Sequence, residues 1–202
     1  MTIALWLVLA YLVGATPTSY LAGRLGRGLD LREHGSKNLG ATNVYRIMGW
    51  WYAIPVGLID VAKGAIPVAL FGRWAIGPAW LPVALGVAAV LGHVYSPYVR
   101  FNGGKGVATA AGMFLALAPL AIPIAFGVWG VVVWLTGYVS LGSITTAALF
   151  PLWVRLTAPE HVAAFWASVG LAVLILFTHR ANIARLLAGT ENRFRSRVES
   201  RS

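Results

Sequence analysis

The chain has 202 residues, of which 58% are hydrophobic and only 11% are charged, and its mean hydropathy is +0.74. A soluble domain of this size cannot hide that much apolar surface, so the composition excludes a soluble globular protein and predicts an integral membrane protein. The net charge is +10, but the basic residues form no separate domain that would bind nucleic acid. Basic residues are expected beside a membrane, where they set the topology and contact anionic lipid. Cysteine is absent, which excludes disulfides, thiolate nucleophiles and cysteine-bound metals.

Apolar runs recur from one end of the chain to the other. Several approach the ~20 residues that cross a bilayer as a helix. The first run is too long for a signal-peptide core and lacks a basic start, so we expect a mature membrane helix. No linker or repeat divides the sequence, which predicts a single domain over 1–202. In chain order the apolar runs are 2–23, 51–72, 78–98, 107–118, 120–138, 142–157 and 161–179.

The stretch 107–138 is too long for a single crossing. As one helix it would measure about 48 Å, against a hydrocarbon core of about 30 Å. Pro119 and Pro123 lie near its middle, and proline removes a helix hydrogen bond and kinks the chain. The sequence therefore predicts two short helices joined by a turn.

The placement of charge predicts the topology. With seven crossings, one side of the membrane has only Arg73 and Arg155, whereas six crossings would separate the basic tail from the first basic loop. The positive-inside rule therefore favours an all-α fold with seven transmembrane helices, the N-terminus outside and the C-terminus cytoplasmic. The cytoplasmic basic residues are then Arg24, Arg27, Arg32, Lys37, Arg46, Arg100, Lys105, Arg180, Arg185, Arg193, Arg195, Arg197 and Arg201.

The first of four polar stretches on this side is the loop 23–46. Glycines and small side chains let backbone N–H groups approach a ligand, and arginines donate to phosphate in pairs. The alternative is an ordinary solvated loop, although the segment is richer in amides and hydroxyls than such loops. The polar residues are Gly35, Ser36, Asn38, Gly40, Thr42 and Asn43, with Arg32 and Arg46.

The second stretch contains FNGGKG, residues 101–106. It is not a Walker A motif, because Val99 replaces the first glycine and Gly106 stands where Ser or Thr would hold magnesium. The glycines around Lys105 instead open a helix from Val107, and a helix N-terminus with a lysine attracts an anion. The alternative is a glycine-rich turn with a topogenic lysine. His93, just upstream, is expected to be buried or interfacial.

The third and fourth stretches are SLGSI and the segment after the last apolar run. Ser140 and Ser143 lie at a turn, where they bind a ligand or cap the next helix. His179, Asn182 and Arg185 recur every three residues, so they share one helix face at the membrane exit. The alternative for that face is a basic amphipathic anchor on anionic lipid.

Two ionisable residues, Asp60 and Lys63, lie within the second apolar run. Ionisable groups inside a membrane are costly and are usually paired or functional. At a spacing of i, i+3 they neutralise each other, so we expect a structural ion pair. The helices hold no further residues for an ion pathway, which counts against a transporter.

Carboxylates are scarce among the polar stretches. The sequence has no acidic cluster for a two-metal site, no HEXXH zinc pattern and no GxSxG serine elbow. A cationic site beside an apolar interior suits a substrate with phosphate at one end and lipid at the other. Positioning and charge neutralisation then carry most of the rate. The carboxylates within the four polar stretches are Asp30, Glu33 and Glu191.

Taken together, GSKNLGATN, GHVYSPYVRFNGGKGVAT, SLGSI and HRANIARLLAGTENR resemble the bacterial acyl-phosphate:glycerol-3-phosphate acyltransferases, the PlsY family, and LIDVAKG matches a further piece. The resemblance implies a multi-pass enzyme of the bacterial cytoplasmic (inner) membrane whose active site faces the cytoplasm. It implies acyl transfer from acyl-phosphate to the sn-1 hydroxyl of glycerol 3-phosphate. The products are lysophosphatidic acid and phosphate, in the first step of phospholipid synthesis.

The resemblance also implies that no metal or other cofactor takes part and that the partners are these two substrates and membrane lipids, with no nucleic acid. The oligomeric state stays open. A membrane carrier or channel for phosphate or glycerol phosphate is the alternative function. It should have polar residues at helical spacing through the outer halves of the helices, and this sequence lacks them.

Carried over residue by residue, the resemblance assigns catalytic roles to Ser36, Lys105, Ser143 and His179. It assigns substrate binding to Asn38, Asn43, Arg46, Gly103, Gly104, Asn182 and Arg185. We expect Lys105 and the N–H groups of residues 103–106 to neutralise the departing phosphate in a direct transfer. An acyl-enzyme formed on Ser36 or Ser143 is the competing hypothesis.

The chain departs from the family pattern at three positions. The family commonly has GSGN where this chain has Lys37 as the third residue, and FKGGKG where this chain has Asn102 as the second. Ser96 stands directly before a proline, where the family usually has an aromatic residue. Near the expected phosphate site, one cation is therefore gained and another is lost.

Overall fold

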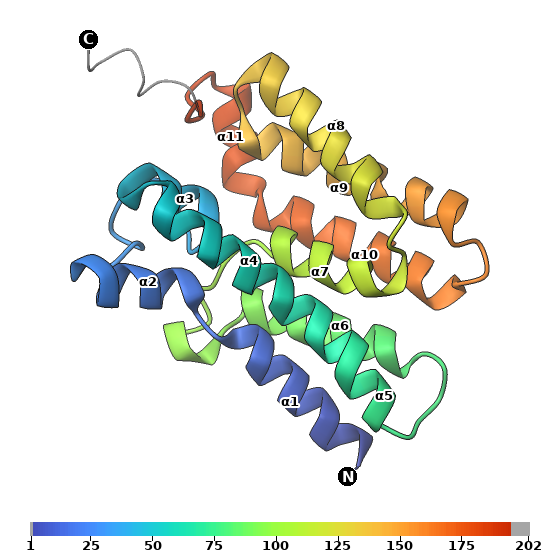
Figure 1. The fold of residues 1–202 in the computed structure, drawn as a ribbon. Helices are drawn as coiled ribbons and strands as arrows, with labels where there is room; N and C mark the ends of the chain where they lie inside the picture. The colour runs from blue at the N-terminus through green and yellow to red at the C-terminus, as the bar shows by residue number, and fades with distance from the viewer. Residues whose placement is uncertain (1, 195–202) are drawn as a thin grey trace. The chain divides into compact units, whose positions relative to one another are not determined.

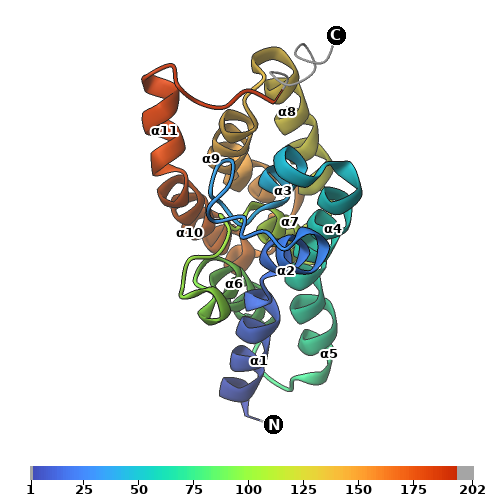
Figure 2. The same cartoon turned by 90° about the vertical axis from the view of Figure 1, so that its left-hand side faces the viewer.

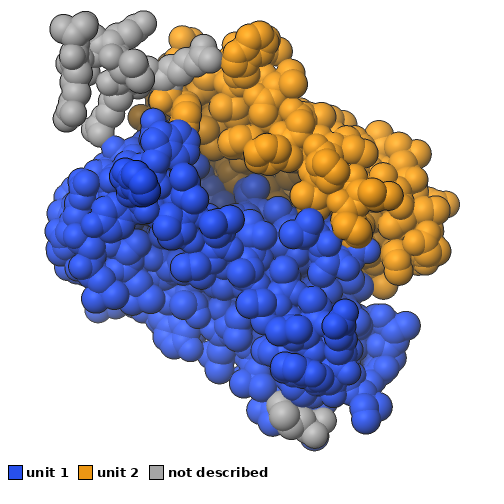
Figure 3. Space-filling model, viewed as in Figure 1, with its two compact units in different colours: residues 1–117 blue, residues 118–202 orange. Residues whose placement is uncertain are grey.

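The chain forms two compact units, Met1–Leu117 and Ala118–Ser202, which Figure 3 distinguishes by colour. The computed structural model describes residues 2–194. The end of the basic tail, with Arg195, Arg197 and Arg201, lies outside the described residues. Between residues 2 and 194 every regular element is a helix, which confirms the all-α prediction.

Unit 1 begins with a broken helix. Pro17, which has no N–H to donate, separates α1 (Ile3–Ala15) from α2 (Thr18–Arg27). The loop that follows contains a short helix not predicted from the sequence, α3 (Ala41–Met48), which buries Val44 and Met48 in a small apolar cluster. The rest of the unit comprises α4 (Trp50–Ile66), the π-helix Pro67–Phe71, α5 (Gly72–Trp74), α6 (Leu81–Val94), the 3-10 turn Pro97–Val99 and α7 (Val107–Leu117).

Two helix pairs form the body of unit 1. Helix α1 packs along α6, and α4 packs along α7 (Figures 1 and 2). Glycines lie at both contacts, Gly14 and Gly92 in the first pair and Gly64 and Gly112 in the second. A Cβ on any of them would overlap the backbone of the facing helix. Small residues allow this close approach, which is how helices associate where water supplies no driving force.

Unit 2 contains four helices between residues 118 and 194, and α9 packs against both α8 and α10. Their bounds are α8 (Ala121–Thr136), α9 (Val139–Thr157), α10 (Val162–Thr178) and α11 (Arg180–Leu187). Helices α10 and α11 meet at His179 with a bend of 57°. The break predicted at Pro119 is confirmed, since α7 ends at Leu117 and α8 begins at Ala121.

All seven predicted apolar runs contain a helix. Four helical stretches among the described residues are long and apolar enough to cross a membrane, and the bent pair α10–α11 makes a fifth. Helices α7 and α8 are apolar but shorter. Large apolar side chains point outward, among them Trp51 at 92% and Phe126 at 70% exposure, as expected of surfaces that face lipid. The four stretches are Ile3–Arg27, Trp50–Trp74, Leu81–Val99 and Val139–Thr157.

Candidate active site

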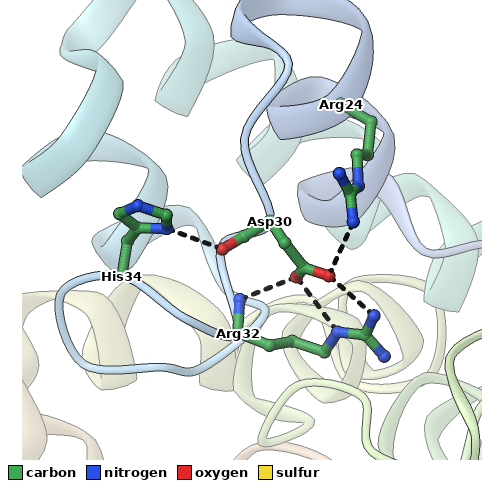
Figure 4. Close-up of polar contacts among 4 residues, drawn as sticks. All are labelled: Arg24, Asp30, Arg32 and His34. Carbon is green, nitrogen blue, oxygen red and sulfur yellow. Dashed lines mark hydrogen bonds and ion pairs between the residues drawn. The ribbon is translucent and has the colours of Figure 1, made fainter.

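A buried carboxylate, Asp30, organises the first polar loop of unit 1 (Figure 4). It accepts hydrogen bonds from the Arg32 guanidinium at 2.7 and 3.0 Å, from the Arg32 backbone N–H at 3.0 Å and from Arg24 at 3.2 Å. Both guanidiniums also lie over the Tyr20 ring. The hydrogen bonds from Arg32 lower the pKa of Asp30 to about 2, against the opposing effect of burial. The loop therefore has a fixed, ionised centre.

Asn43 supports the same loop from inside. Its amide donates to the carbonyls of Leu31 at 3.1 Å and His34 at 3.0 Å, and its Oδ1 accepts the Ser36 N–H at 2.8 Å. The side chain is 1% exposed. Both donors of Asn43, which the sequence predicted to bind substrate, are thus used within the loop. Asn43 shapes the segment that presents the half-buried Ser36 and Asn38.

The neighbouring Lys37 has a φ of +57°, in the left-handed region. A non-glycine residue there costs about 1 kcal/mol, and glycine adopts this conformation freely. The family pattern GSGN has glycine at this position, so Lys37 introduces backbone strain as well as a positive charge. Arg46 lies on the following helix, α3, and is half-buried.

The glycine turn before α7 differs from its prediction in one respect. The N–H groups of Gly103 and Gly104 donate inward, to the carbonyls of Val94 at 3.0 Å and His93 at 3.1 Å. They were expected to face a phosphate, but buried N–H groups must be satisfied and the α6 carbonyls lie within reach. A Cβ on Gly103 would overlap the His93 carbonyl, and one on Gly104 would overlap its ring. The glycines are therefore needed for packing.

The turn also contains Lys105 and leads into the first N–H groups of α7. Lys105 is half-buried, and α7 follows it directly. The first N–H groups of a helix have no intrahelical acceptor and carry the positive end of its dipole. The turn thus offers a lysine and a helix N-terminus above an apolar helix.

In unit 2, Glu191 connects the two polar stretches. Its carboxylate accepts hydrogen bonds from Ser140 on α9 at 2.9 Å and from Asn182 and Arg185 on α11, both at 2.7 Å. Burial alone would raise the pKa of Glu191, but these hydrogen bonds outweigh it and lower the pKa below its ordinary value. The face shared by Asn182 and Arg185 was predicted, and the carboxylate that holds it was not.

His179 lies at the bend between α10 and α11 and is 3% exposed. Its Nδ1 lies 2.8 Å from the Ile175 carbonyl, which can only accept, so Nδ1 bears a proton. Ser143 is the fifth residue of α9, which begins earlier than predicted, and its hydroxyl donates to the Val139 carbonyl at 3.0 Å.

Sequence reasoning assigned no role to Asp30, His93 or Glu191. The one available signal was their context, since each is one of few acids or histidines within a segment otherwise rich in cations, amides and glycines. The ion pair expected between Asp60 and Lys63 is confirmed, with Nζ and Oδ1 2.8 Å apart and both side chains buried.

Comparisons with known proteins show the family to which the chain belongs. Residues 4–189 match the family model described as glycerol-3-phosphate acyltransferase. Proteins of that name from Trichlorobacter lovleyi (44% identity; 95% of this chain and 97% of the relative covered), Fusobacterium nucleatum (42%; 94% and 97%) and Chlorobium luteolum (41%; 96% and 97%) are similar over nearly their whole length.

Two crystal structures of PlsY (YgiH), an integral membrane glycerol 3-phosphate acyltransferase, are similar to this chain. The glycerol 3-phosphate form aligns with a TM-score of 0.89 at 37% identity, covering 95% of both chains. The lysophosphatidic acid form aligns with a TM-score of 0.85 at 36% identity, covering 95% of this chain and 94% of the other. Since the family model and the curated relatives both span almost all of it, the chain belongs to the glycerol-3-phosphate acyltransferase family, with the PlsY integral membrane fold.

Proposed function

We propose that this chain transfers a fatty acyl group from acyl-phosphate to the sn-1 hydroxyl of glycerol 3-phosphate, giving 1-acyl-glycerol 3-phosphate and phosphate. The observation that carries the proposal is the lysine turn at the start of α7, within a unit whose helices expose apolar side chains. It offers charge to a phosphate and an apolar environment to the attached chain. The two similar PlsY structures, a glycerol 3-phosphate form and a lysophosphatidic acid form, support the substrate and product.

The chemistry needs little acid–base machinery because phosphate is already a leaving group. The glycerol hydroxyl attacks the acyl carbon, the bond from that carbon to the phosphate oxygen breaks, and the electron pair leaves with phosphate. The hydroxyl proton goes to the departing phosphate or to His179. No metal or other cofactor enters this scheme.

The proposed roles follow the chemistry of each side chain. Lys105 neutralises the phosphate of the donor, while Arg46 binds glycerol 3-phosphate. Ser36, Asn38 and Ser143 orient the attacking hydroxyl and the acyl carbonyl through hydrogen bonds. The other predicted site residues support these groups. Asn43 shapes the first loop, and Gly103 and Gly104 allow the turn to pack against His93. Asn182 and Arg185 are oriented by Glu191.

The membrane topology is part of the proposal. The four long spans, the bent pair α10–α11 and the shorter helices α7 and α8 together supply seven crossings. The distribution of arginine and lysine supports an outer N-terminus and a cytoplasmic C-terminus in the bacterial inner membrane, with the active site facing the cytoplasm. The family match over both units supports one functional domain.

Phosphate release from palmitoyl-phosphate, with and without glycerol 3-phosphate, tests the function in detergent solution. We expect release that depends on glycerol 3-phosphate, and a carrier or channel would show none. Intact-mass analysis of enzyme quenched with palmitoyl-phosphate alone tests direct transfer. We expect unmodified protein, and an adduct of one acyl group would establish an acyl-enzyme on serine instead.

A further inference from the structure

A buried polar cluster connects α4 to the glycine turn, and the scheme above leaves it without a role. Its members are Asp60 and Lys63 on α4, Thr18 on α2 and His93 on α6, none more than 9% exposed. The Thr18 hydroxyl donates to Asp60 Oδ1. Such a cluster is costly inside a membrane, and a single ion pair on α4 would have neutralised itself without His93. The contact with His93 therefore needs its own explanation.

Lys63 determines which nitrogen of His93 has the proton. Its ammonium lies 2.8 Å from Asp60 Oδ1, 2.8 Å from the Thr16 carbonyl and 3.1 Å from His93 Nδ1. An ammonium has three donors and no acceptor, and its fourth contact, with the Thr18 hydroxyl, is longer at 3.4 Å, so the three shorter contacts take the donors and Nδ1 accepts. Asp60 is 3.8 Å from Nδ1, too far for a hydrogen bond to it. The ring proton is therefore on Nε2.

The opposite edge of the imidazole meets the glycine turn. A Cβ on Gly104 would overlap Nε2, and the His93 carbonyl accepts the Gly104 N–H at 3.1 Å. Beside this contact lies a cavity of about 10 Å³, lined by Lys63, His93, Gly103 and Gly104 among others, with room for about one water. Nε2 has no hydrogen-bond partner among residues 2–194. The ring thus supports the turn and directs an N–H toward the space beneath it.

We propose that Asp60, Lys63 and His93 are positioning residues that fix the Gly103–Gly104 turn and, through it, Lys105. Asp60 holds the Lys63 ammonium, Lys63 holds the imidazole in one tautomer, and the imidazole holds the turn. Lys105 is the next residue along the chain, so its backbone is placed by the same contacts. The inference rests on the proposed function in that it takes Lys105 as the phosphate-binding residue, and it predicts an effect on phosphate affinity.

Two variants at His93 test the hydrogen bonds. His93→Gln keeps one acceptor and one donor, whereas His93→Met keeps an apolar side chain of similar length and neither group. The probe is inorganic phosphate, measured by protection against thermal unfolding, together with the KM for palmitoyl-phosphate. We expect His93→Met to weaken phosphate binding and to raise the KM by about tenfold or more each. In His93→Gln both quantities should stay within about threefold of wild type. Wild-type values in His93→Met, or equal losses in both variants, would overturn the proposal.

A double variant separates positioning from stability. Asp60→Leu with Lys63→Met replaces the ion pair by apolar groups, which commonly leaves stability unchanged or improved. If the pair serves stability alone, a double variant that unfolds at the wild-type temperature binds phosphate normally, and the proposal fails. We expect normal thermal stability with phosphate affinity reduced about tenfold, because the imidazole is no longer held.

The wild-type protein gives a test that needs no folded variant. Nitrogen-15 NMR of the four histidines distinguishes the two neutral tautomers and the charged ring. We expect the proton on Nε2 of His93, and a proton on Nδ1 or a charged ring would overturn the inference. The phosphate and NMR measurements do not depend on turnover. If the wild type forms no product while His93→Met still loses phosphate affinity, the proposed function fails and the positioning role stands.

Discussion

Two buried carboxylates outside the membrane spans, Asp30 in unit 1 and Glu191 in unit 2, organise the polar stretches in different ways. Asp30 binds arginines two and six residues away in sequence, so it closes a single loop. Glu191 binds Ser140, which is 51 residues away, as well as two residues of α11. A carboxylate with local partners shapes one segment, whereas one with distant partners fixes the arrangement of two helices. Loss of the Glu191 carboxylate should therefore reduce activity more than loss of the Asp30 carboxylate.

The largest effect is expected for Glu191→Gln, which keeps the shape and removes the charge. Glutamine keeps one acceptor oxygen but turns the other into an NH2 donor, so Ser140, Asn182 and Arg185 can no longer all donate to it, and we expect activity to fall about 100-fold or more through misplacement of these groups. The free energy of unfolding should fall by about 2–3 kcal/mol. Glu160→Gln is the matched control, because that side chain is 66% exposed in the same unit. Phosphate release within threefold of wild type in Glu191→Gln would contradict the bridging role.

A smaller effect is expected for Asp30→Asn. The first loop would lose its ionised centre while Asn43 continues to support it, so we expect the KM for glycerol 3-phosphate to rise about tenfold with a smaller change in kcat. Glu33→Gln removes an exposed carboxylate from the same loop and serves as the control. If Asp30→Asn costs more activity than Glu191→Gln, the comparison between the two carboxylates is reversed.

The pH dependence of stability offers a third test. The folded-state pKa of Asp30 is about 2, below its ordinary 3.8, so its contribution is fully present above about pH 4 and is lost as the pH falls toward 2. Because the arginine partners are partly exposed and solvent screens them, we expect the free energy of unfolding to fall by about 1–2 kcal/mol over that interval. Asp30→Asn should flatten the decline of Tm between pH 4 and pH 2 in detergent. An unchanged slope would show that other groups cause the decline.

The smallest effect is expected at Lys37, and here two variants are compared. Lys37→Ala and Lys37→Gly both remove the charge, but only glycine adopts a φ of +57° without strain. We expect the glycine variant to be more stable than the alanine variant by about 1 kcal/mol, with activities within twofold of each other. Equal Tm values for the two would mean that the left-handed conformation at this position is not maintained in solution.

Much of the fold could be predicted because hydropathy and proline act locally. Each apolar run contains a helix, and the break near Pro119 occurs where proline removes a hydrogen bond. Helix α3 was missed because it is short and lies within a glycine- and amide-rich loop, where burial of Val44 and Met48 by tertiary packing stabilises it.

The candidate site was predictable in residue type and less so in the role of each residue. Spacing placed Asn182 and Arg185 on one helix face, which the structure shows. The inward N–H groups of Gly103 and Gly104, the support from Asn43 and the tautomer of His93 depend on contacts between segments distant in sequence. A linear pattern does not contain those contacts, so it could not separate residues that face a ligand from residues that hold them in place.

Product formation from competing acyl donors tests the central claim most directly. Purified protein is given isotope-labelled glycerol 3-phosphate with either palmitoyl-phosphate or palmitoyl-CoA, and the lipid product is identified by mass spectrometry. We predict labelled 1-palmitoyl-glycerol 3-phosphate with palmitoyl-phosphate, equimolar phosphate release and a rate that falls sharply in Lys105→Ala and Ser143→Ala. Product from palmitoyl-CoA alone, or no product from palmitoyl-phosphate, would contradict the proposed reaction.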